Sequence, residues 1–249
     1  VKKIKFFNYI FTFFMNDLKY SNTILINLLV ASIIPFLILG PFLPDLIVSI
    51  SALFFLYWVF KNKNYYFFNN KFIIIFFIIC FYYIFVSVFV SEDILFSLKS
   101  SLFYFRIGVF SCFIWYLIDK DKTILNYFYY SLILCFTVLV IDVYYELFKL
   151  NLSGLNISGN RHSSFFGEEL IMGSYLSRLF PLLFALFLIK KKKRFEIYFI
   201  GLLFVLVDIL IYLSGERTAF FYLNISTIFI IILIKEYQKF RLFTFIVGI

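Results

Sequence analysis

The stretch GLLFVLVDILIYLSGERTAFFYLNISTIFIIILI, residues 201–234, consists of two long apolar runs joined by a short polar turn. Each run is long enough to cross about 30 Å of hydrocarbon as a helix that rises about 1.5 Å per residue. The turn, SGER, places a glycine, a glutamate and an arginine side by side. We therefore predict two membrane-spanning helices with a polar connection, and we expect this pattern along the whole chain.

The composition extends this prediction to all 249 residues. The chain is 63% hydrophobic, with a mean hydropathy of +0.99, whereas soluble domains are about 45–50% apolar. We expect an all-α, polytopic membrane bundle that forms a single transmembrane domain over residues 1–249. A ninth apolar run begins at Leu242 and the first residue is Val1, so we expect a fragment of a longer protein. The eight expected spans are 23–40, 43–60, 72–90, 102–118, 123–148, 168–189, 195–213 and 217–234.

The loops between the runs predict the orientation. Lysine-rich loops, such as KNKNYYFFNNK at 61–71, KKKKR at 190–194 and KEYQKFR at 235–241, alternate with loops that hold few lysines, such as SEDILFSLKSS at 91–101. Because positively charged loops stay on the cytoplasmic side, we expect a multi-pass inner-membrane protein with a cytoplasmic N-terminus. The longest loop on the periplasmic side is then 149–168. The basic loops are short and flank the membrane, so no nucleic-acid partner is expected.

Neither a metal nor a cofactor is expected. The three cysteines, Cys80, Cys112 and Cys135, each lie within an apolar run and form no CxxC pair, which is typical of small apolar filler residues. The sequence holds no cluster of metal ligands, no P-loop and no glycine-rich nucleotide fingerprint.

Arginine occurs where the expected topology disfavours positive charge. Six of the 23 basic residues fall on the outer side or within the membrane, and four of these are arginines. A planar guanidinium binds phosphate or carboxylate through two parallel hydrogen bonds, which lysine cannot do. We therefore predict an outward-facing cavity that binds an anionic, amphiphilic substrate. The four arginines are Arg106, Arg161, Arg178 and Arg217.

Each arginine also has a structural interpretation that the sequence leaves open. Arg178 lies ten residues after Glu168, so we expect it about 15 Å down its span, where a charge costs at least ~2.5–3.5 kcal/mol. It therefore faces a polar cavity or pairs with an acid of a neighbouring helix. Arg217 could instead anchor the interface as an ion pair with the neighbouring Glu216, and Arg106 is shallow enough to reach the interface. The acids considered for Arg178 are Asp142, Glu146 and Asp208.

Acidic residues gather on the same side of the expected topology. Asp142 and Glu146 share one helix face at i, i+4, and Glu168 and Glu169 open the span at 168–189, where a helix dipole favours negative charge. We expect the acids to line the cavity with the arginines, and His162 to lie nearby in the outer loop. The residues expected to give polar support are Glu168, Glu169, Glu216, His162 and Asp208.

Two segments carry a resemblance to a known family. In GNRHSSFFGEELIMGSYLSRLFPLLFAL, 159–186, an outer-loop arginine precedes an aromatic–glycine pair and an expected helix with a downstream proline, and YLSGERTAFF, 212–221, is a short turn that contains an arginine. Both segments resemble those of the O-antigen ligase and O-antigen polymerase family of bacterial membrane glycosyltransferases, although Glu216 stands where serine is common in that family. The resemblance covers roughly residues 70–249.

The resemblance implies a metal-independent enzyme that transfers or polymerises undecaprenyl-diphosphate-linked glycans at the periplasmic face, in O-antigen or other surface polysaccharide biosynthesis. The acceptor would be a glycan or the lipid A core, and membrane lipids would surround the site. Arg161 and Arg217 match the motif arginines and are the implied catalytic residues. Arg161, Arg178, Arg217 and Arg106 would bind the diphosphate. Family members carry a further large periplasmic loop nearer the C-terminus, which this chain does not reach.

Two other functions remain open from the sequence. The first is a transporter or flippase for an anionic or lipid-linked substrate, in which the charges within the membrane line the pathway. The second is a structural subunit whose charges only form ion pairs between helices. Ligase and polymerase cannot be separated, because they differ in the acceptor rather than in these two motifs.

Overall fold

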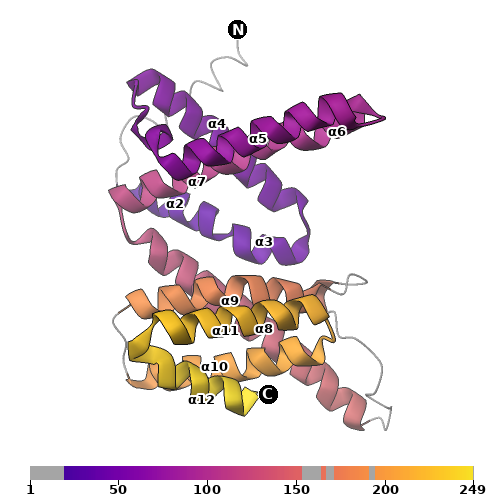
Figure 1. Cartoon of the computed structure of the whole chain (residues 1–249). Helices are drawn as coiled ribbons and strands as arrows, with labels where there is room; N and C mark the ends of the chain where they lie inside the picture. Colours follow the sequence, from indigo (N-terminus) through magenta and orange to yellow (C-terminus); the bar gives the residue numbers. More distant parts are fainter. Residues whose placement is uncertain (1–19, 153–163, 167–170, 191–193, 249) are drawn as a thin grey trace, which may run out of the picture. The chain divides into compact units, whose positions relative to one another are not determined.

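The computed structural model describes residues 20–152, 164–166, 171–190 and 194–248, and every regular element in these ranges is a helix (Figure 1). Among these described residues, six helices are long and apolar enough to cross a membrane, or seven if the bent pair α11 and α12 counts as one span. The described part of the chain is thus all-helical, with the long apolar helices of a multi-pass membrane protein. The described residues cluster into two compact units, one within Val1–Ile33 and Pro41–Leu125 and the other within Ile34–Gly40 and Asn126–Ile249.

The first unit is built around the pairing of α4 with α7, against which α5 also packs. Its core holds Phe55, Val59, Phe67 and Cys112, and Phe55 lies within a cluster of aromatic rings. Side chains begin two of the helices: Asn70 accepts a hydrogen bond from the N–H of Phe72 and Asp93 accepts one from Phe96. The helices are α2 (Tyr20–Ala31), α4 (Phe42–Asn62), α5 (Lys71–Val90), α6 (Ile94–Ser101) and α7 (Phe105–Lys120), with 3-10 turns η1 (Tyr66–Asn69) and η2 (Leu102–Tyr104).

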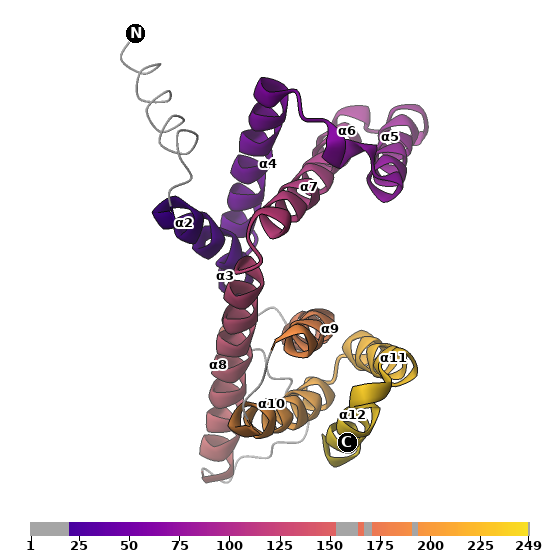
Figure 2. The same cartoon turned by 90° about the vertical axis from the view of Figure 1, so that its left-hand side faces the viewer.

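The second unit gathers four helices that run close together (Figures 1 and 2), with α9 packed on α10 and α11, and α12 packed on α10 and α11. Buried phenylalanines fill its centre, and Phe204 contacts the rings of Phe180, Phe184 and Phe187. Its elements are α3 (Ile33–Leu39), α8 (Ile124–Leu152), η3 (Ser164–Phe166), α9 (Met172–Ile189), α10 (Arg194–Leu213), α11 (Arg217–Leu233), η4 (Lys235–Tyr237) and α12 (Gln238–Gly248).

Five expected spans match helices closely, but the expected count of eight spans and the start of a ninth is not confirmed. The first expected span, 23–40, is split into α2 and α3, and the apolar helix Ile24–Leu39 is shorter than a span. Pro35 explains the break, since a proline ring clashes with the carbonyl group four residues earlier, and α2 ends at that residue, Ala31.

Two further differences concern one segment that was expected to be a loop and the expected ninth span. SEDILFSLKSS, 91–101, contains the helix α6, which together with α7 gives one apolar segment, Ile94–Lys120. The ninth run does not continue α11 in a straight line: α12 follows η4 after a bend of 112°. The pair α11 and α12 is therefore one broken span or a re-entrant loop.

Candidate functional site

A groove of about 470 Å³ lies along α9 and α11 in the second unit. Its walls are almost entirely apolar, and among the described residues the only charged side chain that lines it is that of Arg178. Pro181 and the tyrosine ring of Tyr222 also contribute to it. A groove of this kind suits an elongated apolar ligand that carries a negative charge at one end. The lining residues are Ser177, Arg178, Pro181, Tyr222, Ile225, Ser226, Phe229, Ile230, Leu233 and Ile234.

Arg178 is exposed, and its guanidinium carbon lies 5.9 Å from the centre of the Tyr222 ring. Within the described ranges it forms neither an ion pair nor a hydrogen bond. The helix begins at Met172 rather than at the expected Glu168, so Arg178 lies six residues, or about 9 Å, from the helix start. This distance is shorter than the roughly 15 Å expected from a helix that begins at Glu168.

The two segments that carry the family resemblance contact each other directly. The carboxylate of Glu216, in the SGER turn, accepts hydrogen bonds from the N–H of Gly173 at 2.8 Å and from the N–H of Ser174 at 3.1 Å. The Ser174 hydroxyl donates a third at 2.5 Å. These amides belong to the first turn of α9, whose N–H groups have no partner within the helix. Glu216 therefore caps α9 from the turn that precedes α11.

Arg217 is the first residue of α11, and its side chain is exposed. The expected alternative, a pair with Glu216, is absent from the described structure, because that carboxylate is bound to α9. Arg217 lies five residues before Tyr222, but it is not among the residues that line the groove. The structure thus places Arg178 in the groove, whereas Arg217 stands at the beginning of the helix that forms one wall.

Asp208 does not line a cavity as expected, since its side chain is fully buried and bound to Arg241. Arg241 Nη1 lies 2.6 Å from Asp208 Oδ2, and Nη2 lies 3.2 Å from Oδ1, so the pair is bidentate. Nη2 and Nε also donate to the hydroxyl of Thr227, at 2.6 and 3.2 Å, and the guanidinium lies 4.3 Å from the centre of the Phe180 ring. Neither charge is available to a ligand.

Sequence analysis missed Arg241 by grouping it with the cytoplasmic basic loops, whereas it is 0% exposed. Two signals could have indicated its position. An aspartate inside a span requires a partner, and Arg241, Thr244 and Gly248 follow the i, i+3, i+7 spacing of one helix face. All three are buried in α12.

Arg106 lies in the first unit, where it is bound to α4. Its Nη2 lies 2.7 Å from Asp45 Oδ2 and its Nη1 donates to the Ser49 hydroxyl at 2.9 Å. The structure thus favours the structural interpretation of this arginine over diphosphate binding.

Because the Arg106 and Asp45 side chains are 26% and 60% exposed, water screens the pair. We expect the coupling free energy between Arg106→Ala and Asp45→Ala to be about 0.2–1 kcal/mol. Thermal unfolding of the two single variants and the double variant in detergent would measure it. A coupling of several kcal/mol would contradict the assignment of this pair as a surface contact.

Four predicted site residues lie outside the described ranges: Arg161, His162, Glu168 and Glu169. Part of the loop at 149–168 is described. There, the Ser164 hydroxyl donates to Asp142 Oδ2 at 2.6 Å, so this acid has a partner of its own. Among the described residues, no group of histidine, cysteine, aspartate and glutamate side chains could hold a metal ion.

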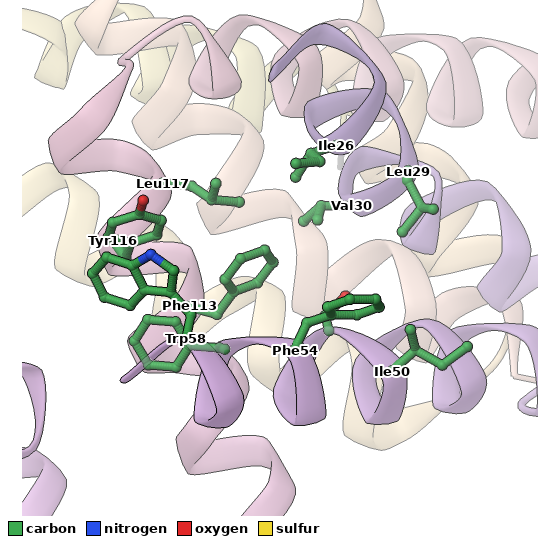
Figure 3. A pocket seen from close by; sticks show the side chains of 11 residues that line it. Ile26, Leu29, Val30, Ile50, Phe54, Trp58, Phe113, Tyr116 and Leu117 are labelled. Atoms are coloured by element: carbon green, nitrogen blue, oxygen red, sulfur yellow. The ribbon is translucent and has the colours of Figure 1, made fainter. Parts of the chain in front are cut away.

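A smaller pocket of about 100 Å³ lies in the first unit between α2, α4 and α7 (Figure 3). Its walls are apolar and aromatic, and the rings of Trp58 and Tyr116, 4.5 Å apart, lie together at one end. None of its lining residues is charged. It therefore offers no positively charged group to an anionic substrate, and the groove along α9 and α11 remains the candidate site.

In comparisons with known proteins, no family model matches this chain, and no curated protein or solved structure matches it either.

Proposed function

We propose that the groove along α9 and α11 binds a polyprenyl-diphosphate-linked glycan, and that the protein transfers or polymerises this glycan at the periplasmic face of the inner membrane. The observation that carries the proposal is Arg178: an arginine without an ionic partner in the described structure, at one place in a groove that is otherwise apolar. A diphosphate would bind the guanidinium, and the polyprenyl chain would follow the apolar walls.

The same arrangement suits the chemistry of glycan transfer. When an acceptor hydroxyl attacks the anomeric carbon, negative charge develops on the departing diphosphate, and fixed cations stabilise that charge. Arg178 would contribute from the groove, and Arg217 and Arg161 would contribute as the motif arginines that the resemblance implies. The proposed orientation puts the Met172 end of α9 and the Arg217 end of α11 on the periplasmic side, as the positive-inside rule predicts.

The binding of undecaprenyl diphosphate tests this proposal. We expect the full chain in lipid nanodiscs to bind undecaprenyl diphosphate more tightly than undecaprenol, because only the former carries the anionic group. Arg178→Gln should raise the Kd for the diphosphate about tenfold, equivalent to ~1.4 kcal/mol, and leave undecaprenol unaffected. Equilibrium binding of the radiolabelled lipids measures both constants.

Arg194→Gln is the matched control for this experiment. Arg194 is an exposed arginine at the start of α10 and does not line the groove, so its loss changes the net charge equally without touching the proposed site. Equal Kd values for wild type and Arg178→Gln, or equal losses in both variants, would contradict the proposal.

A transporter or flippase is the second candidate, because a broken span is a specific observation in its favour. Transporters bind substrate at discontinuous helices, and α11 and α12 are separated by a bend of 112°. Reconstituted vesicles distinguish the two functions: a flippase moves a fluorescent undecaprenyl-diphosphate sugar between leaflets without changing it, whereas a transferase joins its glycan to an acceptor.

A further inference from the structure

The carboxylate of Glu216 connects two helices that are distant in the sequence. It accepts hydrogen bonds from the backbone of Gly173 and from both the backbone and the hydroxyl of Ser174. The residue that precedes α9, Ile171, offers no side chain that could cap these amides. A negative charge at this position also interacts favourably with the helix dipole. Glu216 thus supplies the cap that the local sequence lacks.

The close approach of the SGER turn to the start of α9 depends on Gly173. A Cβ atom at this position would overlap the Ser214 hydroxyl oxygen and would lie 3.0 Å from Glu216 Oε1. Gly173 is buried beneath the SGER turn, and Ser214 also accepts a hydrogen bond from the N–H of Glu216 at 3.3 Å. The missing side chain therefore allows the turn to approach the start of α9 closely enough for the three hydrogen bonds to form.

This contact lies at one end of the groove. Ser174 precedes Arg178 by four residues, about one turn of α9, and Glu216 precedes Tyr222 by six residues at the start of α11. Arg178 on α9 and Tyr222 on α11 both line the groove, and the guanidinium carbon lies 5.9 Å from the centre of the Tyr222 ring. Since helices are stiff over one or two turns, the Glu216 contact sets the distance between the two walls where the arginine stands.

The contact also affects which ion pairs form near the proposed site. Glu216 would be the nearest acid in sequence to Arg217, but its oxygens face α9 and form no pair with that arginine. The backbone of Glu216 is extended, with φ −82° and ψ 105°, as at the residue before a helix. An acid thus lies beside Arg217 without forming an ion pair with either Arg178 or Arg217 in the described structure.

We infer that Glu216 is a positioning residue, which holds α9 and α11 at the separation that lets Arg178 bind an anionic headgroup. The inference rests on the proposed function, because it takes the groove to be the anion site. Glu216 itself contacts no substrate. Its effect is transmitted through the first turn of α9 and the first turn of α11.

Whether Glu216→Gln weakens or tightens the binding of undecaprenyl diphosphate distinguishes a positioning role from a purely electrostatic one. If Glu216 acted only through its charge, Glu216→Gln would remove a repulsive group and tighten the binding of an anion. If it positions the helices, Glu216→Gln should weaken the binding of undecaprenyl diphosphate by about twofold to tenfold, the range that one net hydrogen bond gives. Ser174→Ala should act in the same direction although it changes no charge. The affinity for undecaprenol should stay unchanged in both variants.

Glu236→Gln provides the matched control, since Glu236 is an exposed glutamate in η4, which follows the other end of α11. Amide exchange at Gly173 and Ser174, followed by mass spectrometry, gives a second readout that needs no ligand. We expect Glu216→Gln to accelerate it about tenfold and Glu236→Gln to leave it unchanged. Unchanged exchange in Glu216→Gln, or tighter binding of the diphosphate, would overturn the inference. If Glu216→Gln exchanges faster but the wild-type protein does not bind undecaprenyl diphosphate, the contact between Glu216 and α9 is supported. The proposed anion site is then refuted, and the positioning role with it.

Discussion

Arg241→Ala is expected to destabilise the folded protein by about 3–5 kcal/mol, the usual consequence of removing one partner of a buried ion pair. The substitution leaves the carboxylate of Asp208 fully buried without its bidentate partner, and it also leaves the Thr227 hydroxyl without two donors. A dye that reacts with thiols can follow unfolding, because Cys80, Cys112 and Cys135 are free and buried in the folded state. We expect a decrease in Tm of roughly 6–20 °C at about 2–4 °C per kcal/mol.

Two further variants show whether the loss of stability in Arg241→Ala comes from the unpaired charge of Asp208. Asp208→Leu combined with Arg241→Met removes both charges and keeps apolar volume, so we expect its Tm to recover to within a few degrees of wild type, since apolar replacement of a buried pair is often neutral or stabilising. Arg194→Ala removes an exposed arginine and should have no measurable effect. A Tm of Arg241→Ala equal to that of wild type would show that Arg241 is not buried against Asp208.

The membrane character of the chain could be predicted from sequence because it depends on local composition alone. The expected span 72–90 differs from α5, Lys71–Val90, by one residue at its start, since a long, predominantly apolar run has few alternatives to a helix in lipid. The break between α2 and α3 also had a local cause, Pro35. It was missed because the length of the apolar run was given more weight than the proline.

The partners of the charged residues could not be predicted in the same way. Arg241 was assigned to a loop by its neighbours KEYQKFR, whereas its position depends on Asp208, 33 residues away on another helix. Glu216 was considered as a partner for Arg217 because the two are adjacent in sequence. Adjacent residues at a helix start point in different directions, and the three donors in α9 outcompete a single guanidinium that is exposed to solvent. Such choices depend on tertiary packing, which one sequence does not reveal.

Gly173→Ala should destabilise the second unit by about 1–3 kcal/mol, as overpacking of a tight contact usually does. In an exposed helix this substitution would instead stabilise by up to about 1 kcal/mol through helix propensity. The added Cβ would overlap the Ser214 hydroxyl oxygen and approach Glu216 Oε1 to 3.0 Å, so the turn must move away from α9. We therefore expect a lower Tm together with faster amide exchange at residues 173 and 174.

Gly201→Ala is the control that separates steric conflict from a general effect of the substitution. Gly201 also lies within a helix of this unit, but an added Cβ would meet only the edge of the Phe240 ring, at 3.3 Å, and a small tilt of that ring relieves the contact. Its Tm should stay close to that of wild type. Adding Ser214→Gly to Gly173→Ala removes the nearest obstacle and should restore part of the lost stability and of the protection from exchange. If Gly173→Ala is as stable as Gly201→Ala, the turn does not pack against α9 as closely as the three hydrogen bonds of Glu216 require. The spacing of the groove would then have to be set elsewhere along α9 and α11.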